Sequence, residues 1–222
     1  MSHDKRNVSS TGASGRALYD NLQLAEISKL ERDVSAHLSS KPHRLEHSLA
    51  VGECAESLAL TYGLDPYPAR CAGILHDWDK ALTADETISI ARERGVDMGV
   101  DIALVRPLLH GILAAQELPT LYPELPPEVF QAICRHTTAA VDMSPLDEVV
   151  FVADGIEPNR PASDGIAKAR SLVGEVSLDD LFWESFVGGI IYVLQGSRYL
   201  YPGTIDIYNG IAAHRSTHKE NE

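Results

Sequence analysis

Apolar residues recur with a helical period along most of the 222-residue chain. In most segments they return every two to four residues, which places them on one face of an α-helix. The segments with this pattern are about 16–38, 42–62, 65–77, 84–95, 100–118, 126–136, 145–156, 164–172, 178–199 and 205–213. No segment alternates with a period of two between hairpin turns. The pattern therefore predicts an all-α fold.

Cap and turn residues mark the ends of several of these segments. Residues 83–86 read Thr-Ala-Asp-Glu, which is the pattern of a capping box. Ser144 followed by Pro145 is a typical helix start, because the serine can cap and the proline fits the first turn. Four prolines fall between positions 119 and 127, and they predict a loop there.

The two ends of the chain differ from its middle. Residues 1–15 are small and polar and predict a disordered leader, whereas 214–222 predict a flexible tail. A single domain over 16–213 is expected from this length. No apolar run is long enough to span a bilayer, and the first residues lack the apolar stretch of a secretory signal.

Charge and cysteine content narrow the function. The chain has 19 basic and 32 acidic residues, a formal charge of −13, and such a field repels nucleic acid. A small phosphorylated substrate is compatible with it where metal ions, lysine or arginine supply local positive charge. The three cysteines form no CxxC pair and lie in apolar patterns, so reduced thiols in a cytoplasmic protein are expected. The composition leaves open whether the chain forms a homodimer.

An adjacent histidine and aspartate stand at the centre of the candidate chemistry. His76 and Asp77 follow an apolar run at the end of a predicted helix. Neighbouring residues on a helix project about 100° apart, so both side chains can reach one small volume at a helix end. This arrangement suits one metal ion for each residue, or a carboxylate that bridges two ions.

Four further residues share an apolar setting on other helices. They are His47, His110, His136 and Asp154. Each histidine alone could be a hydrogen-bonded core residue, but a buried aspartate requires a partner or a cation. His43 is expected to be exposed and is left out. Together the residues predict a metal site with six ligands: His47, His76, Asp77, His110, His136 and Asp154.

Several short motifs extend this set. They are Arg44-Leu-Glu-His47-Ser, Ala72-Gly-Ile-Leu-His-Asp-x-x-Lys80, Leu109-His-Gly111, His136-Thr137, Met143-Ser-Pro-Leu146 and Ala153-Asp-x-Ile-Glu-Pro-x-Arg160. With these motifs the chain resembles the HD-domain metal-dependent phosphohydrolase superfamily. Within it the chain is similar to the bacterial YqeK family of symmetrical bis(5′-nucleosyl)-tetraphosphatases. The resemblance covers about 42–170 and implies a single-domain HD-type helical bundle.

The number and type of the ligands indicate a dinuclear centre. Six ligands exceed the four of a tetrahedral zinc site, so two divalent ions with Asp77 as the bridge are expected. Imidazole and carboxylate ligands without thiolate suit iron, manganese, nickel, cobalt or zinc. The resemblance implies iron. A hydroxide that bridges the two ions would be the nucleophile.

The resemblance implies cleavage of diadenosine tetraphosphate into two ADP. Lys80 and Arg160 are the expected phosphate contacts, and Arg44 and Thr137 are further candidates. An HD-type nucleotidase or a cyclic-dinucleotide phosphodiesterase is the alternative from the same chemistry, although the extra glycine-rich signature of the cyclic-di-GMP type is absent. A non-catalytic metal-binding regulatory module is a third reading, against which the retention of all six ligands argues.

Two stretches depart from the family pattern. Trp78 and Asp79 stand between the His-Asp pair and Lys80, where a bulky ring and an added carboxylate are unusual. The family's glycine soon after the His-Thr pair is replaced within Thr138-Ala139-Ala140. These departures are expected to alter the rim of the site and the substrate preference, not the metal ligands.

Overall fold

The computed structural model describes residues 19–219, and in this range it contains ten α-helices and no strand. The helices are α1 (Asn21–His37), α2 (Pro42–Thr61), α3 (Pro66–Leu75), α4 (Ala84–Glu93), α5 (Leu109–Leu121), α6 (Pro127–Arg135), α7 (Pro145–Ile156), α8 (Asp164–Leu172), α9 (Leu178–Gln195) and α10 (Pro202–Lys219). Two short 3-10 helices, η1 (Trp78–Ala81) and η2 (Arg106–Leu108), complete the list. The predicted all-α fold is confirmed. The predicted leader, 1–15, lies outside the described residues.

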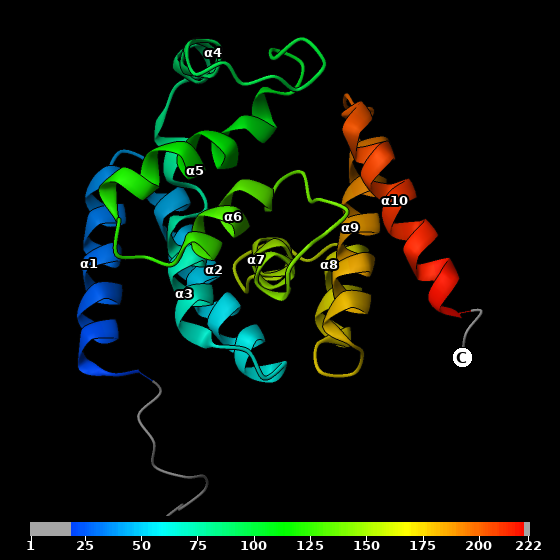
Figure 1. Cartoon of the computed structure of the whole chain (residues 1–222), viewed down its shortest axis with the longest axis horizontal. Helices are drawn as coiled ribbons and strands as arrows, with labels where there is room; N and C mark the ends of the chain where they lie inside the picture. The colour runs from blue at the N-terminus through cyan, green and yellow to red at the C-terminus, as the bar shows by residue number, and fades with distance from the viewer. Residues whose placement is uncertain (1–18, 220–222) are drawn as a thin grey trace, which may run out of the picture.

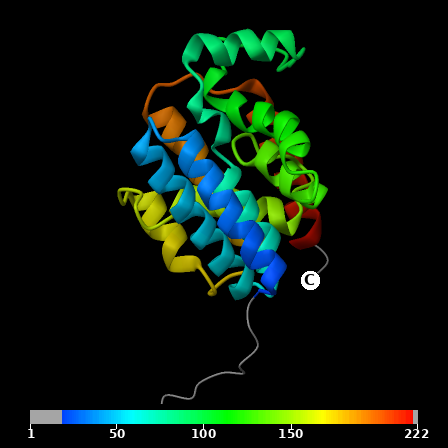
Figure 2. The ribbon, with the colours of Figure 1, turned by 90° about the vertical axis from the view of Figure 1, so that its left-hand side faces the viewer.

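Helix α7 lies in the middle of the molecule (Figure 1). Helices α1, α2 and α3 lie on one side of it and α8 and α9 on the other, and α4 lies at one end above α5 (Figures 1 and 2). α7 packs against α2, α3, α6, α8 and α9. Because it is surrounded, its sequence is apolar nearly all round, and Val149, Val150, Val152 and Ala153 are fully buried.

Two apolar clusters share this central helix. One joins side chains of α1, α3, α5 and α6, and Val150 of α7 belongs to it. The other joins α2, α8 and α9 to the opposite side of α7 through Val149 and Val152. Helices α2 and α3 approach most closely at two glycines, since a Cβ added to Gly73 would lie 2.7 Å from the Cα of Gly52. This close packing fixes the end of α3, where the His-Asp pair begins.

The predicted caps are confirmed, but several predicted helix ends are wrong. Capping boxes start α4 and α7, as expected. Helix α5 continues through Pro119 to Leu121, because this proline is exposed in the last turn, where its missing N–H removes only one hydrogen bond. Helix α1 begins at Asn21, after the Asp20 cap, rather than at position 16.

The last two helices also differ from their predicted bounds. Helix α9 ends at Gln195 rather than near position 199, and Gly196 caps it. Helix α10 runs from Pro202 to Lys219, so six residues that the sequence placed in a tail continue the helix. Among the described residues no helix is both long and apolar enough to cross a membrane.

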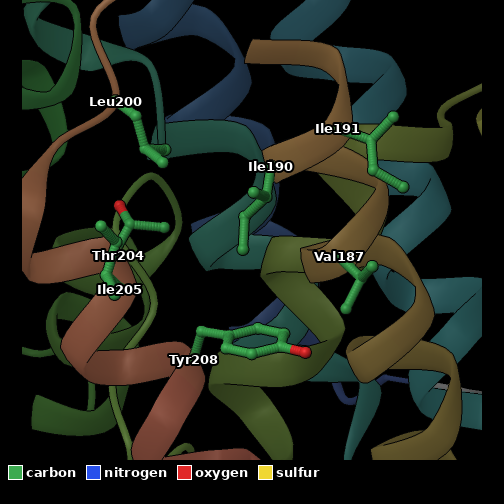
Figure 3. Close-up of a pocket in the computed structure, with 7 residues that line it drawn as sticks. All are labelled: Val187, Ile190, Ile191, Leu200, Thr204, Ile205 and Tyr208. Carbon is green, nitrogen blue, oxygen red and sulfur yellow. The ribbon is translucent and has the colours of Figure 1, made fainter. Parts of the chain in front are cut away.

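An apolar groove runs between α9 and α10 (Figure 3). Ile190 and Val187 of α9 face Ile205 and Tyr208 of α10 across it. The two helices are in contact through Trp183 of α9, which stacks on Tyr208 of α10 with ring centroids 5.1 Å apart. None of the residues that line the groove belongs to the predicted site.

Helix α7 meets α9 and α10 at an acidic junction, which makes stability depend on pH. Glu148 is 9% exposed, and burial together with Asp179 and Asp147 raises its pKa to about 7, against the effect of Arg215. Between the ordinary pKa of a glutamate and about pH 7, Glu148 therefore holds a proton in the folded chain that it has lost in the unfolded chain. Stability falls as pH rises through this window, because the native state binds more protons there.

Glu148→Gln should remove this loss. We expect the variant to unfold about 2 to 4 °C above the wild type at pH 8.5, and at the same temperature as the wild type at pH 4.5. Thermal unfolding followed by circular dichroism at both pH values measures the difference. Glu175→Gln, at an exposed position, is the matched control and should show no pH-dependent shift. Equal shifts for Glu148→Gln at both pH values would contradict this account.

Candidate metal centre

Five helices and the short turn after α3 bring all six predicted ligand residues together. His47 comes from the second turn of α2, and Asp154 from the last turn of α7. His110 lies in the first turn of α5. His76 and His136 each cap the C-terminal end of a helix, α3 and α6, and Asp77 follows His76 directly. The structure places their side chains side by side in the middle of the bundle.

Three of the four histidines are held in the same way. Their Nδ1 atoms donate to the main-chain carbonyl three residues earlier: His76 to Gly73 at 2.7 Å, His110 to Pro107 at 3.0 Å and His136 to Ile133 at 2.6 Å. A carbonyl only accepts, so Nδ1 carries the proton in each ring. The Nε2 atoms are consequently left with a lone pair for another partner.

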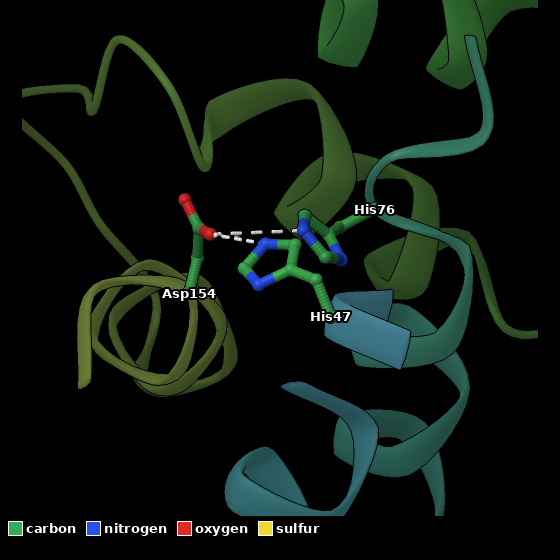
Figure 4. Close-up of side chains that lie close together, drawn as sticks. All are labelled: His47, His76 and Asp154. Atoms are coloured by element: carbon green, nitrogen blue, oxygen red, sulfur yellow. Dashed lines mark ion pairs between the residues drawn. The ribbon is translucent and has the colours of Figure 1, made fainter. Parts of the chain in front are cut away.

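The Nε2 atoms point at one another and at carboxylates. Nε2 of His110 lies 3.0 Å from Nε2 of His136 and 2.9 Å from Oδ1 of Asp77. Nε2 of His47 lies 3.0 Å from Oδ1 of Asp154 (Figure 4). Lone pairs that face each other at such distances repel unless a cation or a proton lies between them.

These distances fit metal ligation. Two ligand atoms bound at right angles to one ion, with bonds of about 2.1 Å, lie about 3.0 Å apart. The buried Nε2 of His76 has no hydrogen-bond partner among the described residues, and it lies 3.6 Å from Asp77 and 3.7 Å from Asp154. An unsatisfied buried nitrogen between two carboxylates is the environment of a metal ligand, and the residues present therefore fit a divalent cation.

The ligand atoms form two overlapping groups. His47, His76 and Asp154 form one, and His76, Asp77 and His136 form the other; the atoms of each group lie within 4.8 Å of one another. The two oxygens of Asp77 face different sides, since Oδ1 faces His110 while Oδ2 lies 3.6 Å from His76. This arrangement is compatible with the predicted bridging role of Asp77.

Protonation also suits metal binding. Burial lowers the pKa of His76, and burial with the neighbouring His110 and His76 lowers that of His136 to about 3, so both rings are neutral. Burial alone would raise the pKa of Asp77 and Asp154, but the surrounding histidines hold both well below the ordinary value. These are the forms of the four residues that bind a metal ion. Burial lowers the pKa of His47, but Asp154 and Asp77 raise it by more, so a metal ion would displace a proton from this ring.

Two arginines lie against the carboxylates at the open side of the site. Nη1 of Arg44 donates to Oδ2 of Asp77 at 2.7 Å, and Nη2 of Arg160 donates to Oδ1 of Asp154 at 2.6 Å. The two side chains are 39% and 37% exposed, so a ligand in solvent can reach them. They line an open pocket above His47, with Asn159 and His43.

Two residues of this rim, His43 and Asn159, are not among the predicted site residues, and neither is Arg106. His43 lies one turn before His47 on the same face of α2, and its spacing of four residues from His47 indicates this position. Asn159 follows Glu157 in the turn after α7. Arg106 lies close enough to Lys80 to lower its pKa, although burial is the larger cause. No local signal marks Arg106 as a site residue.

Lys80 and Thr137, both predicted phosphate contacts, lie in different situations. The ammonium of Lys80 has no hydrogen bond or ion pair within 19–219, so it is available to a ligand. The Thr137 hydroxyl instead donates to the carbonyl of Leu108 at 3.0 Å. This bond ties the end of α6 to η2, and so helps to place His110 rather than offering a donor to substrate.

The expected effect of Trp78 and Asp79 on the rim is wrong. A 3-10 helix has about three residues per turn, so η1 places Asp77 and Lys80 on one side and the two residues between them on the other. Trp78 is buried and stacks on His37 with ring centroids 3.9 Å apart. Asp79 is also buried, and burial with the nearby Glu117 raises its pKa to about 7.

The second departure has a backbone explanation. Ala139, in the stretch that replaces the family's glycine, has φ of 59°, a left-handed conformation that favours glycine. Its side chain is buried in the cluster of α2, α7, α8 and α9. The methyl group therefore offsets part of the backbone cost by its burial, and the residue does not reach the site.

In this helical bundle a His-Asp pair, three further histidines and a late aspartate converge on one candidate metal site. A family model described as HD domain matches residues 44–159. The chain belongs to the HD-domain family. It is 33% identical over 176 residues to the symmetrical bis(5'-nucleosyl)-tetraphosphatase of Halalkalibacterium halodurans, covering 79% of this chain and 91% of that protein. The enzyme of the same name from Bacillus subtilis is 30% identical, over 77% of this chain and 90% of its own length.

A solved structure shows the same fold. It is a protein of Clostridium acetobutylicum described as a predicted HD superfamily hydrolase involved in NAD metabolism, with a TM-score of 0.74 and 30% identity. The match covers 84% of this chain and 97% of that chain. The resemblance drawn from the sequence motifs is thereby confirmed, and the single-domain HD fold with it.

Proposed function

We propose that this chain hydrolyses diadenosine tetraphosphate at its central anhydride bond and releases two ADP. The observation that carries the proposal is the convergence of four Nε2 lone pairs and two carboxylates beneath a rim of cationic side chains. The names of the curated relatives support the same substrate class.

The ligand set supports two divalent cations, which we take to be iron, with manganese, nickel, cobalt or zinc able to replace it. The six ligands offer nitrogen and oxygen without thiolate, which suits each of these metals. When bound, such ions would polarise phosphoryl oxygens and supply a nucleophile from water. His47, His76 and Asp154 would hold one ion, and His110 and His136 the other, with Asp77 within reach of both.

The chain's own residues would orient the substrate. Arg44 and Arg160 already lie against the ligand carboxylates, so a phosphate bound to the metal would lie within reach of both guanidinium groups. Lys80, whose ammonium forms no hydrogen bond or ion pair among the described residues, would neutralise charge on the departing diphosphate. These cations explain how an acidic protein could bind a polyanion.

The cleavage position has a direct test. Hydrolysis of diadenosine tetraphosphate in oxygen-18 water should give ADP alone, half of it carrying the label, as read by chromatography and mass spectrometry. ATP together with AMP would show asymmetric cleavage and contradict the proposal. A preference for mononucleotides on the same substrate panel would favour the nucleotidase alternative.

Arg160→Ala should raise KM by about 10- to 100-fold, since one charge-assisted contact to phosphate is worth about 1.5 to 3 kcal/mol. Steady-state kinetics on diadenosine tetraphosphate measure this change. Because Arg160 also donates to Asp154 at 2.6 Å, metal content must be measured on the same sample. Loss of metal with unchanged KM in the metal-reloaded variant would assign Arg160 to holding Asp154 instead.

We also place the enzyme in the cytoplasm. The three cysteines, Cys54, Cys71 and Cys134, are all free thiols. Such thiols persist where the compartment is reducing. Burial raises the pKa of Cys71 to about 12, which keeps this thiol protonated and unreactive.

A further inference from the structure

His47 differs from the other three histidines in the partner of its Nδ1 atom. The others donate to main-chain carbonyls, whereas Nδ1 of His47 lies 3.1 Å from Oε1 of Glu157. Glu157 directly follows α7, three residues after Asp154, and is only 2% exposed. Among the four histidines, only His47 has a carboxylate behind its Nδ1 atom. Burying this carboxylate is costly, so its presence needs a reason.

Both oxygens of Glu157 are used as acceptors. Oε2 accepts the main-chain N–H of Asn159 at 2.6 Å, while Oε1 faces Nδ1 of His47. A main-chain N–H can only donate, so Oε2 is committed. Oε1 is therefore placed to accept a hydrogen bond from Nδ1 of His47, while Nε2 of the same ring faces Oδ1 of Asp154 at 3.0 Å, where a cation would replace any proton between them.

The carboxylate is held rigidly from behind. The main-chain N–H of Glu157 donates to Ala153 at 3.0 Å. Arg170 of α8 donates to the carbonyls of Ile156 at 2.9 Å, Glu157 at 2.5 Å and Arg160 at 3.1 Å. One guanidinium thus fixes the turn that carries Glu157 to α8.

We propose that Glu157 is a positioning residue that locks His47 in the tautomer with the proton on Nδ1. In this tautomer the unprotonated Nε2 of His47 points at the metal position formed with His76 and Asp154. The negative charge of Glu157 makes the ring a stronger electron-pair donor. The inference deepens the metal centre proposed above and rests on it. Partners of this kind behind a ligand are worth about 10- to 100-fold in metal affinity.

Glutamine at this position tests the lock, because its amide offers one acceptor and one donor. If its oxygen faces Asn159, its NH₂ faces His47 and favours the tautomer with the proton on Nε2, which cannot bind a metal. If the amide is reversed, its NH₂ faces the N–H of Asn159, and the turn must shift. Either way, Glu157→Gln keeps the volume of the side chain and removes the paired acceptors.

The experiment is a Zn²⁺ titration of metal-free protein against a chromophoric chelator. Glu157→Gln should bind one equivalent of Zn²⁺ about 10- to 100-fold more weakly than the wild type and the other with little change. Glu46→Gln is the matched control. Glu46 lines the same open pocket, is exposed, and forms no hydrogen bond or ion pair within the described residues. We expect wild-type affinity for both equivalents in this control.

The tautomer can be read directly. Long-range ¹H–¹⁵N spectra of the Zn²⁺-loaded protein, labelled at histidine, show which ring nitrogen of His47 carries the proton. The wild type should show a protonated Nδ1, and Glu157→Gln at equal Zn²⁺ occupancy should show either a shifted Nδ1 proton signal, since its carboxylate acceptor is gone, or a His47 ring that no longer binds Zn²⁺. The signals of His47 are assigned by their absence in His47→Gln.

Two results would overturn this inference alone, and a third would also overturn the proposed metal centre. Unchanged Zn²⁺ affinity and an unchanged His47 spectrum in Glu157→Gln would overturn it. So would a lower unfolding temperature of the metal-free variant with wild-type Zn²⁺ affinity, since Glu157 would then only hold its turn. A wild-type protein that binds no Zn²⁺ would overturn the metal centre itself together with this inference.

Discussion

Asp77→Asn should lower kcat/KM on diadenosine tetraphosphate by about 10³-fold or more, which corresponds to at least about 4 kcal/mol of transition-state stabilisation. Oδ1 of Asp77 lies 2.9 Å from Nε2 of His110, and Oδ2 accepts from Arg44 at 2.7 Å. Asparagine has one acceptor and one donor in these places. Its NH₂ must face either the arginine, which only donates, or the position of the metal.

Metal content should fall with activity. We expect Asp77→Asn to lose at least one of two ions per chain, because it removes both the negative charge and one ligand oxygen. Elemental analysis of protein purified without chelator measures this. Asp79→Asn is the matched control, since Asp79 is also buried, lies two residues away and faces the opposite side of η1. Full metal content and activity in Asp77→Asn would remove this residue from the centre.

The ligand residues could be selected from sequence because their settings are unusual. A histidine at the end of an apolar run, such as His136, or an aspartate at the end of a buried helix, such as Asp154, is conspicuous against a helical period. The motifs then placed them in one family. The helices α2, α7 and α8 also lie within a residue of their predicted bounds, since prolines, serines and a glycine mark their ends.

The supporting residues could not be selected in the same way. Glu157 acts through His47, which lies 110 positions earlier in the chain, and only the packing of α7 on α2 brings them together. The direction of the Trp78 side chain depends on η1 being a 3-10 helix rather than an α-helix. The two differ by less than one residue per turn, and the sequence does not mark this difference. Long-range pairing and local helical pitch are thus the information that periodicity lacks.

The same dependence on packing makes Gly111 a sensitive position. It follows His110 in the first turn of α5, where α5 crosses α6. A Cβ added there would lie 2.6 Å from the carbonyl oxygen of Ile133 and 2.8 Å from Cε1 of His136. The new methyl group would therefore meet the hydrogen bond, 2.6 Å long, that Nδ1 of His136 donates to Ile133.

Gly111→Ala should consequently separate α5 from α6 and displace His136 and His110 together. We expect a loss of about 1 to 3 kcal/mol in the free energy of unfolding, as for an overpacked core. Since a displacement of about 1 Å at a reacting centre costs about 10²-fold in rate, kcat should fall by a similar factor. Urea unfolding, metal analysis and steady-state kinetics on one preparation measure the three effects.

Gly155→Ala is the matched control for the same chemical change beside another ligand. Gly155 follows Asp154 in α7, and a Cβ there would meet nothing within 4 Å. Alanine favours a helix by about 0.5 to 1 kcal/mol over glycine, so this variant should be as stable as the wild type or more so, with full metal content. Wild-type stability and metal content in Gly111→Ala would mean that α5 and α6 separate at little cost, and that the contact between Gly111 and His136 does not set the position of the ligand.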